Sequence, residues 1–198
     1  MSANAPSLTP ARRLVVGVSG ATGVVYALRL LHILSELGSI ETHLVVSSAA
    51  ARTLALETDY SLAQVLALAH THYSFNDIGA AIASGSFKTL GMIVIPCSVK
   101  TLSGIAHSYS DNLLLRAADV TLKERRPLIL SFRETPLHAG HLRLMLAATE
   151  LGAIVAPPMP AFYSKPASLQ DVIDHHVGRL LDLLQIEFPE HLLKRWPG

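Results

Sequence analysis

The chain has 198 residues, of which 50% are hydrophobic and 16% are charged, with a formal net charge of +1. This charge gives no general attraction to nucleic acid or anionic membranes, and no apolar run is long enough to span a bilayer. We expect one domain with a sizeable core, residues 14–198. Residues 1–13 lack the apolar core of a secretory signal and are interpreted as a disordered arm. The single cysteine, Cys97, excludes an internal disulfide and fits a reducing cytoplasm.

Short apolar runs alternate with helical patterns along the whole chain. The expected strands are 14–18, 43–46, 92–95, 128–132 and 153–156. The expected helices are 24–37, an Ala-rich segment after 48, 62–68, 99–106, 111–124, 141–151 and 169–184. The segment 70–88 is irregular and is interpreted as a functional loop. This order predicts a three-layer, doubly wound α/β fold of flavodoxin or Rossmann type, with a mostly parallel sheet and helices on both faces.

Ligands of such folds bind beyond the carboxyl ends of the strands. The first strand runs into GVSGATG at residues 17–23, whose glycines let backbone amides approach an anion at a helix start. The turn has neither the lysine of a P-loop nor the GxGxxG spacing. Taken alone, this turn is equally compatible with an anion-binding site and with a tight connection between a strand and a helix. Together with Ser47 at the next strand end, it favours a phosphate or flavin site.

A second candidate site is the end of the strand 128–132, where Arg133 and Glu134 follow directly. Arg116 and Lys123 lie seven residues apart on the preceding helix and therefore share a face. Two cations on one face, with an acid and a cation at a strand end, indicate a site that binds a phosphate and moves a proton. The alternative for Glu134 is a surface ion pair of little energetic value.

Other candidates have plainer interpretations. Cys97 is expected to be a small buried hydrophobic residue, and Ser98 an N-cap with Lys100 facing solvent. Arg125 and Arg126 are expected to offset a helix dipole. The pairs at 138/141 and 175/176 are expected to be surface or interface histidines and not a metal site, because neither cysteine nor an acidic cluster accompanies them.

Taken together, these segments resemble the UbiX/Pad family of flavin prenyltransferases over nearly the whole chain after the arm. The most specific match is DNLLLRAADVTLKERR at 111–126 with RETP at 133–136. The other matching segments are GVSGATG at 17–23, SGSFK at 84–88, PCS at 96–98 and AFY at 161–163. Two positions depart from the pattern: Thr22 stands where many relatives have serine, and Ile78 where many have tryptophan.

The resemblance implies metal-independent transfer of a dimethylallyl group, from its monophosphate or diphosphate, to N5 and C6 of reduced FMN. It also implies a homododecamer with sites at subunit contacts, and a UbiD-type decarboxylase that receives the prenylated FMN. By motif, Glu134 is the proton donor and acceptor, and Lys123 and Thr22 are also catalytic. The implied FMN contacts are Gly20, Ala21, Thr22, Ser47, Ser98, Thr101 and Arg133. The implied prenyl-phosphate contacts are Arg116, Lys123, Tyr163 and Arg179.

Two alternatives share this fold class. One is an FMN-dependent decarboxylase of a peptidyl or phosphopantothenoyl cysteine, which needs an early catalytic histidine and an Asn-bearing loop that are not evident here. The other is a non-catalytic FMN-binding subunit of an aromatic acid decarboxylase. The charged set of Arg116, Lys123, Arg133 and Glu134 argues against it, because a mere carrier does not need these residues.

Overall fold

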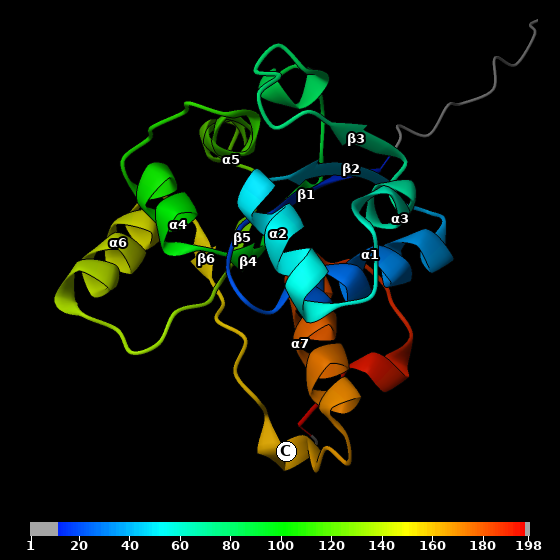
Figure 1. Ribbon diagram of the computed structural model, residues 1–198. Coiled ribbons are helices and arrows are strands. Elements are labelled where there is room, and N and C mark those ends of the chain that lie inside the picture. Colours follow the sequence, from blue (N-terminus) through cyan, green and yellow to red (C-terminus); the bar gives the residue numbers. More distant parts are fainter. Residues whose placement is uncertain (1–11, 197–198) are drawn as a thin grey trace, which may run out of the picture.

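The computed structural model describes residues 12–196. Its centre is a six-stranded sheet with the order β3-β2-β1-β4-β5-β6, in which every neighbouring pair is parallel (Figure 1). The strands are β1 (Arg13–Val18), β2 (Glu41–Val46), β3 (Thr71–Tyr73), β4 (Gly91–Cys97), β5 (Leu128–Phe132) and β6 (Ile154–Val155). The α-helices are α1 (Val24–Leu37), α2 (Ser48–Glu57), α3 (Leu62–Ala67), α4 (Val99–Ala106), α5 (Leu113–Lys123), α6 (Ala139–Glu150) and α7 (Leu169–Leu183). The 3-10 turns are η1 (Ala81–Ala83), η2 (Phe162–Ser164) and η3 (Glu190–Leu192).

The central strands are apolar on both faces, as parallel strands between two helical layers must be. All residues of β4 and β5 are buried, and so are all residues of β1 except Arg13. β1 pairs with β4 in the register Val16 to Ile93. The chain order of the strands reverses between β1 and β4, because β2 lies on the far side of β1 and β5 on the far side of β4. This switch point is where ligands of doubly wound sheets bind.

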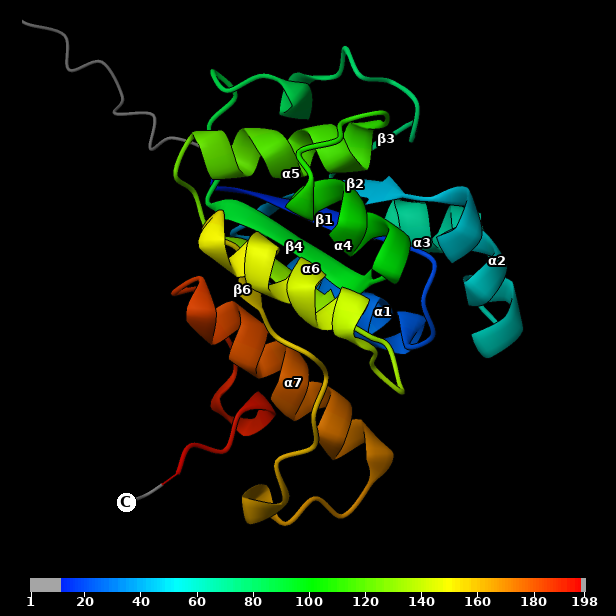
Figure 2. The ribbon, with the colours of Figure 1, turned by 90° about the vertical axis from the view of Figure 1, so that its left-hand side faces the viewer.

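The helices divide between the two faces of the sheet. One hydrophobic cluster joins the sheet to α1 and α7, with Leu30, Leu34 and Leu180 in its interior. The other joins the sheet to α4 and α5, with Leu102 and Leu113 in its interior. Figure 2 shows α5 above the sheet and α7 below it. Side chains on α5 and α7 are therefore separated by the thickness of the sheet.

The predicted fold class and the alternation of elements are confirmed, and Gly38 ends α1 in the left-handed conformation with φ of 60°. The segment 70–88 has more regular structure than the predicted loop, because it contains the edge strand β3 and the turn η1. β2 begins at Glu41, two residues before its predicted start. Of the predicted arm, residues 1–11 lie outside the described part, whereas Arg13 is already the first residue of β1.

Two charged or polar residues expected at the surface have structural roles instead. His176 is 7% exposed and its Nε2 lies 2.9 Å from the Ser131 hydroxyl, so burial lowers its pKa to about 4. Arg126 donates to the carbonyl oxygens of Gly85 and Phe87 at 2.7 and 2.8 Å. The cation fixes the end of the 70–88 segment onto α5, which is a more specific role than offsetting a helix dipole.

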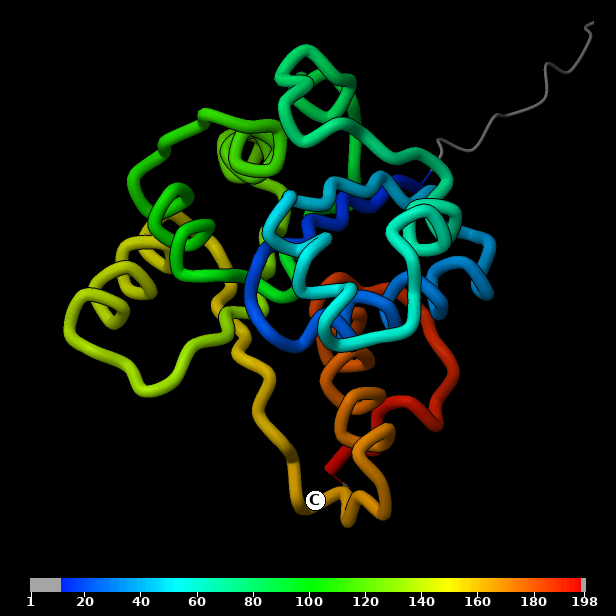
Figure 3. The backbone as a smooth tube through the Cα atoms, viewed as in Figure 1, coloured from blue at the N-terminus to red at the C-terminus, as the bar shows by residue number. Residues whose placement is uncertain are grey.

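After β6 the chain leaves the sheet. Figure 3 shows it running, yellow to orange, to a turn near the start of α7. This turn is η2 and it carries Tyr163. Of the helices between residues 12 and 196, none combines the length and the apolar character needed to cross a membrane.

Cys97 is fully buried, as expected, and burial raises the pKa of its thiol well above the ordinary range. Because the thiolate is the reactive form, we predict that a thiol reagent modifies the native protein only as fast as it unfolds. Absorbance of a chromogenic disulfide reagent, with and without denaturant, measures this. Stoichiometric labelling of the native protein within the mixing time would contradict the burial of Cys97.

Candidate active site

A cavity of about 370 Å³ opens at the switch point between β1 and β4, within the size range of small-molecule sites. Eight residues proposed from the sequence line it: Gly20, Ala21, Thr22, Ser47, Ser98, Thr101, Arg133 and Glu134. Seven of them come from the loops that follow β1, β2, β4 and β5, and Thr101 lies in the first turn of α4. The carboxyl ends of parallel strands share one edge of the sheet, and this brings distant segments of the chain together.

Three helices begin at the cavity wall. The Ser47 hydroxyl caps α2 by accepting from the Ala50 amide at 3.1 Å, and the Ser98 hydroxyl caps α4 by accepting from the Thr101 amide at 3.3 Å. Asn112 caps α5 in the same way, and it too lines the cavity. Each helix start carries partial positive charge from its unpaired amides. The convergence of three such ends makes the cavity suitable for an anionic ligand.

The Ser19 side chain joins the two central loops. Its hydroxyl donates to the Pro96 carbonyl at 2.9 Å and accepts from the Ser98 amide at 2.8 Å. Ser19 is 2% exposed, so this linkage is shielded from water. The hydroxyl thereby fixes the distance between the β1 loop and the start of α4, which form two walls of the cavity.

Gly20 allows a close approach that no other residue permits. A Cβ atom at this position would lie 2.3 Å from the Cβ of Ala49, which belongs to α2. Real Cβ atoms do not come so close, so any side chain at position 20 would push the β1 loop away from α2. The glycine therefore keeps the β1 loop close to α2, and its exposed backbone lines the cavity.

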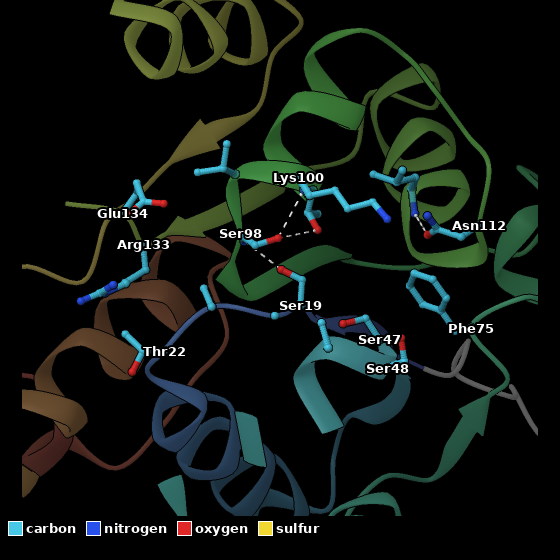
Figure 4. Close-up of a pocket in the computed structure, with 16 residues that line it drawn as sticks. Ser19, Thr22, Ser47, Ser48, Phe75, Ser98, Lys100, Asn112, Arg133 and Glu134 are labelled. Atoms are coloured by element: carbon cyan, nitrogen blue, oxygen red, sulfur yellow. Dashed lines mark hydrogen bonds between the residues drawn. The ribbon is translucent and has the colours of Figure 1, made fainter. Parts of the chain in front are cut away.

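Charged groups enter the cavity from opposite sides. Figure 4 shows the guanidinium group of Arg133 and the ammonium group of Lys100 extending away from one another, with the serine hydroxyls between them. Within residues 12–196, no carboxylate lies at ion-pair distance from either cation. Glu134 is half-buried and accepts only from the amide of its neighbour Thr135, at 2.9 Å. The alternative of a surface ion pair for Glu134 is therefore not realised.

Glu57, which the sequence reasoning missed, closes the wall beside Thr22. It ends α2, and its carboxylate accepts from the backbone amides of Gly23 and Val24 at 2.9 and 3.0 Å. It also accepts from the Thr22 hydroxyl. The start of α1 has no side-chain cap of its own, since Gly23 occupies the N-cap position. An acid from another helix thus satisfies these amides, and the Thr22 hydroxyl is held in place by it.

The cations proposed for the prenyl phosphate do not line this cavity. Arg116 donates to Asp119 at 2.7 Å and to the Ala83 carbonyl at 3.3 Å. Lys123 pairs with Glu124 and lowers the pKa of that carboxyl. Both side chains lie beside the segment 83–85, since an added Cβ on Gly85 would meet the Lys123 ammonium. The predicted shared face of Arg116 and Lys123 is confirmed, but it points toward this segment.

Tyr163 and Arg179 lie on the opposite side of the sheet, with α7. The Tyr163 hydroxyl is 3.2 Å from Nε2 of His175, and Arg179 pairs with Asp182. Tyr163 is 45% exposed, so its ring is accessible from outside the protomer. One protomer therefore contains two separate groups of predicted phosphate ligands, one on α5 and one beside α7, and a cavity that neither reaches.

Among the lining residues, Ser19, Phe75 and Asn112 had no role assigned from the sequence. Lys100 was expected only to face solvent; it is exposed, but it also lines the cavity, because it lies in the first turn of α4. Asn112 carried a usable signal, because asparagine directly before an apolar helical pattern is a common N-cap. Phe75 carried none, because its position depends on tertiary contacts such as the hydrogen bond from the Leu113 amide to its carbonyl at 2.9 Å. Ile78 is 60% exposed and does not line the cavity. Among residues 12–196, no three metal-ligating side chains gather as a metal site requires.

We predict that Glu57→Ala lowers the free energy of unfolding by about 1–2 kcal/mol, because it removes the cap of α1. Glu57→Gln keeps an acceptor oxygen and should lose less. Urea unfolding followed by far-UV circular dichroism measures both. The matched control is Glu36→Ala, at an exposed position of α1. An equal change in Glu57→Ala and in the control would contradict the capping role.

Comparison with known proteins agrees with this geometry. A family model described as Flavoprotein matches residues 2–178. The flavin prenyltransferase UbiX of Escherichia coli strain K12 is 60% identical over 187 residues, which cover 94% of this chain and 99% of that protein. A solved structure of AnUbiX (PadA1) in complex with FMN and dimethylallyl pyrophosphate superposes with a TM-score of 0.90 at 49% identity, covering 94% of this chain and 98% of that one.

A dodecameric FMN-dependent UbiX-like decarboxylase from Escherichia coli O157:H7 also superposes with a TM-score of 0.90, at 49% identity, over 94% of this chain and the whole of the other. Fold, site and identity agree over nearly the full length of these relatives. The chain belongs to the UbiX family of flavin prenyltransferases.

Proposed function

We propose that this protein joins the dimethylallyl group of dimethylallyl monophosphate, or of the diphosphate, to N5 and C6 of reduced FMN. The observation that carries the proposal is the position of Arg133 and Glu134. Both enter the cavity at the switch point, and neither is engaged by an ion pair within the described residues. A cation and an acid held there are the groups that phosphate departure and proton transfer require.

The cavity has the features that an FMN molecule needs. The amides at the starts of α2, α4 and α5 suit its phosphate. Gly20 is exposed and lines the cavity, so its backbone can contact a flat ring, and its lack of a Cβ keeps the β1 loop packed against Ala49. The hydroxyls of Ser47, Ser98 and Thr101 offer hydrogen bonds along the wall. We therefore assign Gly20, Ala21, Thr22, Ser47, Ser98, Thr101 and Arg133 to FMN.

In the proposed reaction, reduced FMN supplies nucleophilic positions at N5 and C6. The allylic C–O bond breaks and its electron pair leaves with the phosphate, whose charge Arg133 and the other cations stabilise. Bond formation at N5 releases the N5 proton, which leaves with the departing phosphate. Glu134 then donates a proton to the double bond of the allyl group, C6 bonds to the resulting cationic carbon, and Glu134 accepts the proton that C6 loses. The same carboxyl thus acts first as acid and then as base. Fixed cations thus take the place that a metal ion has in other phosphate-releasing enzymes.

We infer that neighbouring copies complete the phosphate site. Arg116 and Lys123 are on α5, whereas Tyr163 and Arg179 accompany α7, and the two helices cover opposite faces of one sheet. No rearrangement short of unfolding brings these four side chains around one phosphate within a protomer. A closed assembly, the homododecamer expected for this family, can do so.

The exposed apolar surface supports such an assembly. α6 has one buried residue, Ala148. The leucine side chains on and next to α6 are largely exposed: Leu137 by 44%, Leu142 by 53%, Leu146 by 59% and Leu151 by 40%. Contiguous exposed apolar surface of this kind marks protein contacts, and a second copy is the partner that the proposed shared site requires.

We further propose that residues 14–198 act as a single FMN-binding domain and that the protein works in the cytoplasm. There the lone thiol stays reduced. The prenylated FMN is made for a UbiD-type decarboxylase, which uses it as a cofactor. Thr22 and Lys123 assist catalysis in this proposal: the first from beside Glu57, the second from the α5 face presented to a neighbouring copy.

The direct test is to incubate the purified protein with reduced FMN and dimethylallyl monophosphate under anaerobic conditions, and to measure the flavin by mass spectrometry. We expect FMN enlarged by one dimethylallyl group. The diphosphate is tested in parallel. Recovery of unmodified FMN with both donors would refute the proposed activity.

Glu134→Gln should slow this turnover by roughly 10²-fold or more, because the amide cannot exchange a proton. FMN affinity should stay within about twofold of the wild type, since the side chain keeps its size and an acceptor oxygen. Single-turnover rates and flavin fluorescence titration measure the two quantities. Glu150→Gln, at an exposed position of α6, is the control. A parallel loss of rate and FMN affinity would assign Glu134 a structural role instead.

Gly20→Ala should weaken FMN binding by tenfold or more, because the new methyl group displaces the β1 loop from Ala49. Gly79→Ala is the matched control, since a Cβ there meets nothing closer than an Asp77 oxygen at 3.5 Å. Isothermal titration with FMN gives both affinities. If the two variants bind FMN equally well, the close approach at Gly20 does not shape the site.

A further inference from the structure

Residues Lys194, Arg195 and Trp196, here called the strap, pass over the surface that carries Tyr163 and Arg179. Lys194 donates from its ammonium group to the Ser164 carbonyl at 3.4 Å, next to Tyr163 in the η2 turn. Arg195 donates to Asp182, and the Trp196 ring contacts the Tyr163 ring. The strap thus contacts both side chains that we assign to the prenyl phosphate on this face, either directly or through one intermediate residue.

Tyr163 lies between two aromatic rings. The indole of Trp196 meets the Tyr163 ring edge-on, with centroids 5.4 Å apart and planes at 88°. The imidazole of His175 meets it at 5.7 Å and 80°, and its Nε2 lies 3.2 Å from the phenol oxygen. Edge-to-face pairs of this kind stabilise one ring orientation. The strap residue Trp196 and the α7 residue His175 together define where the phenol points.

His175 is itself tied to the strap. Partial burial lowers the pKa of His175, and a hydrogen bond with the Lys194 backbone offsets this in part. Nε2 of the ring lies 3.2 Å from the Tyr163 hydroxyl, so His175 stands between the phenol and the Lys194 backbone. Loss of the strap would release both restraints on Tyr163 at once.

Arg179 is linked to the strap through Asp182. One oxygen of this carboxylate accepts from Arg195 at 2.6 Å, and the other accepts from Arg179. The two cations lower the pKa of Asp182. His175, Arg179 and Asp182 follow one another at helical spacings of four and three residues, so they share one face of α7. With Arg195 holding one oxygen, Asp182 orients the Arg179 guanidinium without neutralising the combined positive charge of this surface.

We propose that the strap is a positioning element for the prenyl phosphate: it holds Tyr163 through Trp196 and Arg179 through the Arg195–Asp182 pair. This inference rests on the proposed function, because it concerns the positions of Tyr163 and Arg179, the residues that we assign to the prenyl phosphate. The strap touches neither the FMN cavity nor Glu134, so it acts on binding of the phosphate donor and not on flavin affinity or proton transfer.

The test uses the full-length, FMN-loaded protein. Trp196→Ala and Arg195→Ala should each raise the KM for dimethylallyl monophosphate roughly tenfold, while kcat and FMN affinity stay within about twofold. Trp196→Phe keeps an edge-to-face ring, and Arg195→Lys keeps a cation, so both should restore most of the affinity. Arg52→Ala, at an exposed position of α2, is the control for loss of a surface arginine. Size-exclusion chromatography confirms that the assembly is retained.

Trp196 is the one tryptophan of the sequence, so its emission reports on the strap without labelling. We expect a saturable change in emission when the wild type is titrated with dimethylallyl monophosphate, and loss of this change in Arg179→Ala. Unchanged KM values in the strap variants, or a fall in FMN affinity that parallels them, would overturn the proposal. If the wild type makes no prenylated FMN, the proposed function fails. In that case the emission titration still tests the strap separately. A saturable response supports its role in binding dimethylallyl monophosphate, and the absence of a response refutes that role.

Discussion

The site depends on how the loops after β1 and β4 are held apart at the point where the strand order reverses. The Ser19 hydroxyl sets this spacing, because it donates to the Pro96 carbonyl and accepts from the Ser98 amide within a buried environment. A hydrogen bond shielded from water is costly to leave unmade, so the two loops cannot drift independently. Gly20, on one side of this linkage, and the start of α4, on the other, form the cavity that we assign to FMN.

The charged groups assigned to the site fall into two sets, one lining the cavity and one outside it. Inside it, three helix starts attract an anion together with Arg133 and Lys100, which form no ion pair within residues 12–196, and Glu134 is the acid among them. Three further cations lie outside it, on the two faces of the sheet: Arg116 is paired with Asp119, Lys123 with Glu124 and Arg179 with Asp182. In the proposed function, one protomer binds the flavin and supplies parts of the phosphate site to its neighbours. The proposal therefore links activity to assembly, and the leucines exposed along α6 are the surface that such an assembly would cover.

Much of the cavity was predictable from the sequence, because parallel strands bring their carboxyl ends to one edge of the sheet whatever the conformation of the loops. Ser47, Ser98, Arg133 and Glu134 each follow a strand, and this alone places them together. Glu57 could not be predicted in this way, because it does not follow a strand. It reaches the start of α1 from the end of α2, and this tertiary contact leaves no periodic pattern in the sequence. The same holds for Phe75 and for the strap, whose positions follow from tertiary contacts. Arg116 and Lys123 were placed correctly on one helix face, but the sequence did not show that this face meets the segment 83–85, because that is a tertiary contact.

An experimental structure of the protein with FMN and dimethylallyl monophosphate bound would decide between a shared site and a site within one protomer. We expect the flavin ring between the Gly20–Thr22 backbone and the start of α4, with the Glu134 carboxylate within reach of the C6 proton, directly or through one water. We also expect Tyr163 and Arg179 at each phosphate to come from a different copy than Glu134. A flavin bound away from the β1 and β4 loops, or a phosphate held by one protomer alone, would refute the proposed site.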